Sequence, residues 1–327
     1  MRIKDIGQII MLFIMILLGP CMVLTAYMHL YKKYYYKGEK IMPVKDDLGT
    51  RMKEQYEKKP RTYLERKVPV AIRIDGKAFH TFTKGFNRPF DDILISSMQE
   101  TTKYLCEHVQ GCVLGYTQSD EITLILIDYQ NENSDAWFEY QVQKICSISA
   151  SMATAYFNKI FSEKVYDYEH EYYEAWNHST QEEKYMNALH KAVDNLAMFD
   201  ARCFNIPVEE VPNLIYWRQL DARRNSIQMV GQTYFSAKQL HGKTCDDIRD
   251  MLKSECSIVW EEFENYKKWG SCCIKHKINK TTADNQNIVR NVWTIDKHIP
   301  IFVKEDRHYI DDLICVGNWN VTEGASE

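Results

Sequence analysis

The pattern of apolar and polar positions predicts a strand followed by a helix at the start of the folded part of the chain. Residues 68–74 are apolar apart from one arginine, which is typical of a strand buried on both faces. Between 91 and 109, apolar residues recur at helical spacing, and Asp91 or Asp92 can cap the start of that helix. The fold therefore begins with a strand, a polar loop and a helix.

The same pattern continues with a hairpin, a second helix and a last strand. Two β-rich runs at 112–117 and 121–128 are joined by a short polar link, which predicts a hairpin. Residues 137–161 show helical spacing, and a charged, tyrosine-rich stretch at 162–187 leads to LAMFDARCFNIP, a strand that Pro207 ends. This is the order of a βαββαβ unit, so we predict an α+β, ferredoxin-like fold with a four-stranded antiparallel sheet and two helices on one face.

A long helix is predicted from residue 208 onward. Residues 244–327 mix a short helix at 245–253 with an aromatic loop and β segments around 272–278 and 289–295. We therefore expect one domain at 42–207 and a helical and β part at 208–327 that packs on it. In the long helix, the predicted apolar face carries Leu214, Trp217, Leu220, Ile227, Val230 and Phe235, and the predicted polar face carries Arg218, Arg223 and Arg224.

An uncharged apolar run at residues 9–28 precedes this fold. It is long enough for a helix that crosses a hydrocarbon core, and the lysines after it would leave the bulk of the chain in the cytoplasm. A cleaved signal peptide fits poorly, because the run is followed by a poor cleavage site. The other interpretation is translation from Met42, since residues 42–59 read as the polar start of a soluble enzyme. An anchor and a misplaced start both remain open, and no fold prediction rests on residues 1–41.

Composition narrows the class of protein. The chain has 327 residues, 45% of them hydrophobic, which is enough for one large domain or two modest ones. A net charge of −4 argues against a polybasic protein, so any contact with nucleic acid must come from a local patch. The ten cysteines form no CxxC pair, which argues against zinc, and their apolar surroundings favour free thiols in the cytosol.

Two groups of carboxylates meet in the predicted sheet. In a βαββαβ unit the first and third strands are neighbours, which brings Asp75 close to Asp120 and Glu121 at the tip of the hairpin. Like charges at this range raise each other's pKa, and Mg²⁺ relieves the repulsion because it prefers oxygen ligands and bridges carboxylates to phosphates. Gly76 would let a metal or phosphate approach the backbone. Two such ions can serve a phosphoryl transfer.

Basic side chains near these carboxylates would suit a triphosphate. They are Lys77, His80, Lys84 and Arg88. The arginines of the long helix could meet an RNA backbone, and a solvated helix face is an equal interpretation of the same pattern.

Four long strings give the chain a family resemblance. RIDGKAFHTFTKGFNRPFDD, GYTQSDEITLIL, FDARCFNIP and YWRQLDARRNSIQMVGQTYFS resemble the tRNA-His guanylyltransferase family, particularly its bacterial-type branch of 3′-to-5′ polymerases. The resemblance covers roughly residues 43–315. It implies a polymerase-type palm domain at 42–207, with 208–327 contacting tRNA, and a homo-oligomer, a tetramer in the family.

The resemblance also implies an activity and a set of site residues. The enzyme would activate the 5′ end of a tRNA with ATP or GTP, and the 3′ hydroxyl of an incoming nucleotide would attack that end. Asp75 and Asp120 would hold two Mg²⁺ together with the Gly76 carbonyl, and Glu121 would be a supporting catalytic carboxylate. The nucleotide would be bound by Asp75, Gly76, Lys77, Ala78, Phe79, His80, Ser119 and Asp120, and the tRNA by Arg218, Arg223, Arg224 and Asn225.

Two departures from the family pattern bear on the substrate. The chain has DARRNS at 221–226 where the enzymes that add a guanosine to tRNA-His have a HINN-type motif, and it has Trp269 where an Arg-Gly is common. Both favour templated repair of 5′-truncated tRNAs over strict specificity for tRNA-His. A nucleotidyl cyclase is the alternative enzyme, since cyclases share the palm and the paired acids. An RNA-binding protein that has lost catalysis is the alternative without turnover.

Overall fold

The computed structural model describes residues 47–131, 133–174, 179–281 and 287–315. The chain forms two units, Met1–Pro60 and Arg61–Glu327. In the first unit the described residues form helix α2, Asp47–Met52, which continues into a π-helical turn, Lys53–Glu57. The strands that the structure describes lie in the second unit.

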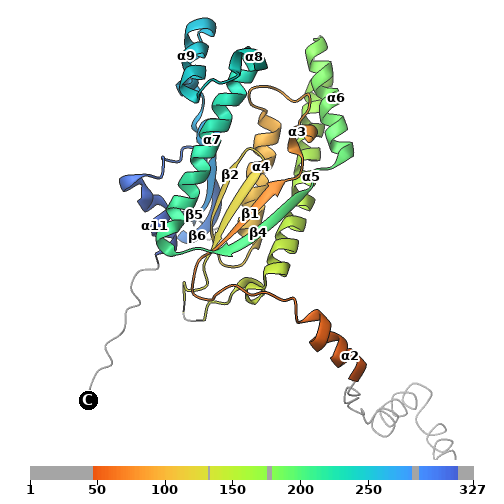
Figure 1. The fold of residues 1–327 in the computed structure, drawn as a ribbon, viewed down its shortest axis with the longest axis vertical. Helices are drawn as coiled ribbons and strands as arrows, with labels where there is room; N and C mark the ends of the chain where they lie inside the picture. Colours follow the sequence, from red (N-terminus) through yellow and green to blue (C-terminus); the bar gives the residue numbers. More distant parts are fainter. Residues whose placement is uncertain (1–46, 132, 175–178, 282–286, 316–327) are drawn as a thin grey trace, which may run out of the picture. The chain divides into compact units, whose positions relative to one another are not determined.

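A six-stranded antiparallel sheet forms the centre of the second unit (Figure 1), in the order β4-β1-β3-β2-β5-β6. The four expected strands are confirmed, and β1 pairs with β3 as predicted. Asp75 on β1 lies opposite Glu121 on β3 and opposite Asp200 on β4. The strands are β1 Val70–Gly76, β2 Cys112–Gln118, β3 Glu121–Leu126, β4 Phe199–Asn205, β5 Ser271–Thr281 and β6 Asn287–Asp296.

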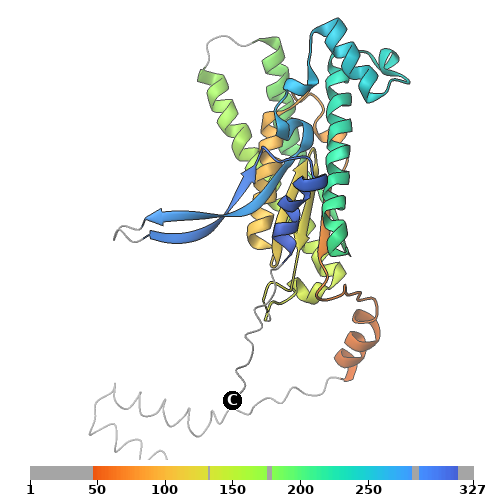
Figure 2. The same ribbon diagram turned by 90° about the vertical axis from the view of Figure 1, so that its left-hand side faces the viewer.

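The predicted four-stranded unit is present, and two C-terminal strands extend it to six strands. β5 joins the sheet through a short ladder in which residues 271–273 pair with residues 115–117 of β2. The rest of β5 pairs with β6 alone, and Figure 2 shows this two-stranded arm reaching beyond the sheet. The β segments around 272 and 289 were recognisable from the sequence, but their partner strand lies more than 150 residues away in the chain.

Helices α4, Asp92–His108, and α5, Val142–Glu174, cover one face of the sheet, as expected. Asp91 caps α4 by accepting a hydrogen bond from the Leu94 amide. α5 runs well past residue 161, and a further helix, α6 at Thr180–Asn195, lies in the charged stretch where none was predicted. A capping box at Ser179 begins α6, and Tyr185 and Leu189 are buried on its inner side.

Helices also cover the other face of the sheet. α7, Val211–Tyr234, and α11, His308–Ile314, share a core with side chains of the strands. The C-terminal half of α7 packs instead against α9, Cys245–Cys256, in a separate cluster. The remaining elements are α3 Phe79–Phe82, α8 Ala237–Leu240, α10 Asn265–Trp269 and the short 3₁₀ turns Trp137–Tyr140, Val208–Glu210, Trp260–Glu262 and Lys304–Arg307.

The predicted faces of the long helix were wrong at its N-terminal half. Trp217 and Leu220, expected in the core, are exposed, whereas Arg218, expected on the polar face, is buried. The reason is that α7 packs on the sheet in its first half and on α9 in its second, so no single apolar stripe fits the whole helix. Arg218 therefore does not lie where an RNA backbone could reach it.

The apolar run at 9–28 lies outside the described residues. Among the residues that the structure describes, no helix is both long enough and apolar enough to cross a membrane.

Candidate active site

The end of β1 and the tip of the β2–β3 hairpin lie side by side. The Gly76 amide donates a hydrogen bond to the Asp120 carbonyl oxygen over 3.1 Å, which ties the two segments together at the sheet edge. Ser119 and Asp120 form the turn between β2 and β3, and Ser119 adopts a left-handed backbone with φ of 50°. The structure thus confirms that Asp75 and Asp120 are neighbours, as the predicted strand order required.

Asp120 carries its charge in an unfavourable place. Burial raises the pKa of the Asp120 carboxyl, and the nearby negative charge of Asp75 adds to the increase. The Ser119 hydroxyl donates a hydrogen bond to Asp120 Oδ1 over 3.1 Å and offsets part of it. Among the described residues, neither Asp75 nor Asp120 forms an ion pair with a basic side chain. A cation bound between them would remove this strain.

Glu121 has a different environment from Asp120, although the two are adjacent in sequence. It is 6% exposed, and it accepts a hydrogen bond from Arg73 Nη2 over 2.8 Å. Arg218 Nε lies 2.8 Å from the other carboxylate oxygen. Two guanidinium groups therefore hold Glu121, which we expected beside the metal ligands as a supporting carboxylate.

Arg218 also pairs with a second carboxylate, Asp221 on α7, which lies closer to the cavity described below. Arg218 Nη2 lies 2.5 Å from Asp221 Oδ2, and Arg224 pairs with the other oxygen of Asp221. Asn225 Nδ2 donates to Asp221 Oδ2 over 3.3 Å. A chain of polar contacts thus links Glu121 on the sheet to Asn225 on the wall of the cavity.

Gly76 is explained by packing as well as by chemistry. A Cβ atom at this position would lie 2.3 Å from the Phe79 ring, far inside van der Waals contact. Phe79 is 5% exposed and packs against Phe157 and Phe199 in the core. Most of the Phe79 ring is therefore committed to the core, and the residue also lines the cavity described below.

The other predicted triphosphate ligands lie on the surface around the end of β1. Lys77 is exposed in the turn after the strand, and its amide donates to the Met198 carbonyl over 2.8 Å. Ala78 has a left-handed backbone with φ of 55°, and His80 is exposed on α3. Arg88 is exposed on the loop that follows.

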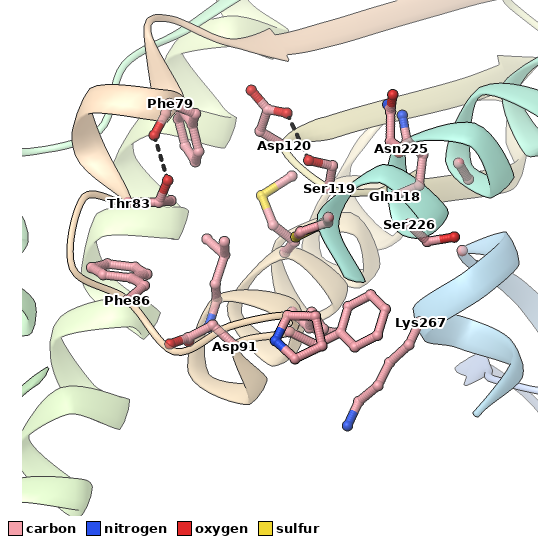
Figure 3. A pocket seen from close by; sticks show the side chains of 18 of the residues that line it. Phe79, Thr83, Phe86, Asp91, Gln118, Ser119, Asp120, Asn225, Ser226 and Lys267 are labelled. Atoms are coloured by element: carbon pink, nitrogen blue, oxygen red, sulfur yellow. Dashed lines mark hydrogen bonds between the residues drawn. The ribbon is translucent and has the colours of Figure 1, made fainter. Parts of the chain in front are cut away.

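A cavity of about 530 Å³ opens beside Asp120 (Figure 3), a size typical of small-molecule sites. The hairpin tip forms its upper end, and α3 with the loop after it forms one side. One face of α7 forms the opposite side. Its lining includes Gly76, Ala78, His80, Ser119 and Asp120 from the prediction, Arg88 from the loop, and Asn225 from α7.

Asp91 shapes the floor of this cavity. Its carboxylate oxygens accept hydrogen bonds from the Leu94 amide over 2.9 Å and from the Asn87 amide over 3.1 Å. Burial raises the pKa of the Asp91 carboxyl. Asp91 therefore both begins α4 and fixes the loop that carries Arg88.

Several lining residues were not predicted from the sequence. Sequence reasoning placed Asn225 and the arginines at a tRNA surface, and it assigned no role to the polar residues that share the cavity wall. They come from four separate elements, and each alone reads as an ordinary polar residue, so only the fold reveals them. They are Gln99, Gln118, Ser226, Gln232, Tyr266 and Lys267.

The donor set at the strand end suits a hard divalent cation. Asp75 and Asp120 supply carboxylate oxygens and Gly76 a carbonyl oxygen, which are the ligands that Mg²⁺ prefers. In the described part of the chain, no three His, Cys, Asp or Glu side chains form a metal cluster, in keeping with the way Glu121 is turned to its arginines. Such a site is open to additional ligands such as phosphate.

The part of the chain that contains this site matches a known protein family. A family model described as tRNAHis guanylyltransferase matches residues 49–207, which include Asp75, Asp91 and Asp120. A probable tRNA(His) guanylyltransferase of Dictyostelium discoideum is 26% identical over 265 residues, which span 77% of this chain and 93% of that protein.

Solved structures are also similar to this chain. A bacterial tRNA(His) guanylyltransferase-like protein in complex with ATP superposes with a TM-score of 0.67 and 37% identity, over 82% of this chain and 99% of that one. The GTP complex of such a bacterial protein gives a TM-score of 0.64 and 35% identity over the same shares.

Proposed function

This chain belongs to the tRNA(His) guanylyltransferase family and is a nucleotidyltransferase of that kind, and we propose that it adds nucleotides to the 5′ end of tRNA in the 3′-to-5′ direction with Mg²⁺. The proposal is supported chiefly by one observation. Asp75 and Asp120, two carboxylates without a basic partner in the described residues, are neighbours, and Asp120 lines a cavity of nucleotide size.

Asp75, Asp120 and the Gly76 carbonyl would hold two Mg²⁺ in this proposal. When bound, these ions supply charge stabilisation to the phosphate oxygens during transfer. The protein's own contribution is to fix the two carboxylates, through the hydrogen bond from Gly76 to Asp120 and through the strand ladder that sets Asp75 beside the hairpin. ATP and GTP, which the similar bacterial proteins bind, would be the substrates.

The cavity would bind the activating nucleotide. The turn at Lys77 and Ala78, with His80, Arg88 and Ser119, would contact its triphosphate, where cationic and hydrogen-bonding groups suit phosphate oxygens. A 5′-phosphate oxygen of the RNA attacks the α-phosphorus, and pyrophosphate leaves. The 3′ hydroxyl of the incoming nucleotide then attacks the RNA 5′-phosphorus, and the nucleoside monophosphate leaves.

Templated repair of 5′-truncated tRNA is the substrate preference that we propose, ahead of a single guanosine added to tRNA-His. The residues at 221–226, DARRNS, depart from the HINN-type motif, and the structure places Asn225 and Ser226 of this stretch at the cavity wall. Arg223 and Arg224 are partly exposed on the same helix and remain proposed tRNA contacts.

We also propose that the enzyme works in the cytoplasm, where its tRNA substrate is found, as a homo-oligomer, with a tetramer as the family resemblance suggests. If residues 9–28 anchor the protein, the catalytic unit would face the cytoplasm. Light scattering of the purified protein and mass spectrometry of its native N-terminus test these points.

The experiment is incubation of the protein with a labelled tRNA lacking its first nucleotide, ATP, GTP and Mg²⁺, followed by sizing of the product. We expect growth at the 5′ end that requires Mg²⁺ and is lost in Asp75→Ala and Asp120→Ala, while Asp194→Asn, an exposed carboxylate on α6, retains activity. A tRNA that stays unextended under these conditions contradicts the proposal.

The same assay without RNA separates the alternative enzyme. A nucleotidyl cyclase would convert GTP or ATP alone to a cyclic nucleotide, which chromatography detects. Full-length tRNA-His and a 5′-truncated tRNA specific for another amino acid are compared as substrates. Extension of the first indicates guanosine addition to tRNA-His, and extension of the second indicates repair.

A further inference from the structure

On the N-terminal half of α7, two large apolar side chains are exposed and a charged one is buried. Trp217 is 51% exposed and Leu220 is 42% exposed, while Arg218 between them is 5% exposed. A single exposed apolar residue is ordinary, but a large exposed pair beside a buried charge is an informative departure. This side of α7 is therefore a candidate contact surface.

The Trp217 ring is held by two fixed guanidinium groups. Arg218 Cζ lies 4.1 Å and Arg73 Cζ 5.3 Å from the ring centroid. Both arginines are themselves bound by Glu121. The indole thus has cationic neighbours in set positions and still leaves half of its surface to solvent, the arrangement of a rigid stacking platform.

The sheet next to Trp217 is open as well and leads to the reaction site. Arg202 on β4 is the register partner of Arg73 on β1, so both side chains lie on the face that α7 covers. Arg202 is exposed on this edge strand. Asp75 follows Arg73 by two positions on β1 and lies on the same face. From Trp217, this face therefore continues along β1 to the proposed metal ligand.

The cavity lies on another side of α7. Ala222, Asn225 and Met229 face the cavity, and Trp217 and Leu220 are not part of its lining. Two substrates must meet at Asp75 and Asp120. A nucleotide in the cavity occupies the approach from that side, so the RNA end needs a second approach.

We propose that Trp217 and Leu220 form a stacking surface for the terminal bases at the acceptor end of the tRNA, with Arg202 and Arg224 contacting the phosphates. The inference rests on the proposed function and deepens it. Stacking on an aromatic ring tolerates any base, which suits an enzyme that repairs different tRNA ends. Arg224 belongs to the same stripe, since it lies four residues after Leu220 on α7 and is exposed.

The charges favour RNA over a second copy of the chain as the occupant. The planar guanidinium of arginine matches phosphate geometry. Arg73 and Arg218 contact the Trp217 ring, and Arg202 on β4 and Arg224 on α7 are exposed, each paired with an aspartate. A second copy seated here would also close the face that leads along β1 to Asp75.

The test is binding of a fluorescently labelled, 5′-truncated tRNA to full-length protein, measured by anisotropy with Trp217→Ala, Trp217→Phe and Tyr234→Ala. Tyr234 is the matched control, because it is 45% exposed on the same helix and lies outside the cavity lining. Each variant is also measured for ATP binding without RNA and for molecular mass by light scattering.

We expect Trp217→Ala to weaken tRNA binding about tenfold or more, Trp217→Phe to retain most of the affinity, and Tyr234→Ala and ATP binding to stay unchanged. Unchanged tRNA binding by Trp217→Ala overturns the inference, and so does a change in mass that shows an interface between copies. The two failures are distinguishable. If the wild type extends tRNA and Trp217→Ala binds tRNA normally, the inference fails and the proposed function stands. If the wild type does not extend tRNA, both are contradicted.

Discussion

Asp120 and Glu121 are adjacent in sequence and carry the same charge, yet the structure gives them opposite surroundings. Asp120 lies at the hairpin tip beside Asp75 with a raised pKa, and among the described residues its one side-chain hydrogen-bond partner is the Ser119 hydroxyl. Glu121 is the first residue of β3, points to the α7 face of the sheet and is neutralised by Arg73 and Arg218.

This difference separates two tasks that the sequence SDE places together. A carboxylate that is to bind a metal cation must not already be paired with a basic side chain of the protein. Its repulsion from a neighbouring carboxylate then destabilises the metal-free protein. A carboxylate that holds strands and helix together needs internal partners, because a buried charge without them is strongly unfavourable. Asp120 fits the first description and Glu121 the second.

The largest expected effect is on activity at the open carboxylates. Asp75→Asn and Asp120→Asn keep the shape of each side chain but remove the charge that binds the cation, so 5′ addition should fall about a thousandfold or more. Single-turnover assays with circular dichroism of each variant measure this against an intact fold. Activity within a few-fold of wild type in either folded variant would remove Asp75 or Asp120 from the metal site.

Glu121→Gln should act on stability instead. It leaves Arg73 without its carboxylate and Arg218 with Asp221 alone, so the free energy of unfolding should fall by about 3 kcal/mol. Urea unfolding measures the loss. Below its melting temperature the variant should keep activity within about tenfold of wild type, and a loss of activity as large as that of Asp120→Asn would show that Glu121 shares the metal site.

A smaller loss of stability is expected from a side chain at Gly76, the residue next to Asp75. Gly76→Ala places a Cβ 2.3 Å from the Phe79 ring, and overpacking of this kind costs about 1–3 kcal/mol. The double variant Gly76→Ala, Phe79→Leu should recover part of the stability lost. A double-mutant cycle by urea unfolding checks this, and additive losses would mean that the ring is not what excludes a side chain.

The smallest effect concerns pH and the metal-free protein. Because the folded-state pKa of Asp120 is raised above the ordinary aspartate value of 3.8, ionisation of this group costs stability as pH rises through that pKa. Asp120→Asn should therefore raise the melting temperature of the metal-free protein slightly at neutral pH, with no gain below pH 3.8. Thermal unfolding of both proteins in the presence of a chelator, at a series of pH values, measures this difference. If the melting temperature of Asp120→Asn at pH 7 equals or falls below that of the wild type, the repulsion between Asp75 and Asp120 is contradicted.

Much of the sheet end that carries Asp75 and Asp120 could be predicted because it depends on local pattern. Buried strand runs and one short hairpin fix the order of β1 to β4, and that order alone brings Asp75 to Asp120. The glycine at 76 was also singled out, although the contact with Phe79 that constrains it depends on where α3 places that ring.

The partners of Glu121 could not be predicted because they come from a distant helix with two packing partners. Helical periodicity assigns Trp217 to the inside and Arg218 to the outside, and the sheet and α9 together reverse that assignment. The attachment of β5 to β2 was missed for a similar reason, since a ladder of three residues leaves almost no trace in the sequence.

The most direct test of the central claim is the number of Mn²⁺ ions bound per chain in the presence of a non-hydrolysable ATP analogue, measured by electron paramagnetic resonance. Mn²⁺ replaces Mg²⁺ at oxygen sites. The account predicts two ions for the wild type and for folded Glu121→Gln, and loss of protein-bound ions in Asp120→Asn. Equal binding by wild type and Asp120→Asn, or loss in Glu121→Gln alone, would contradict it.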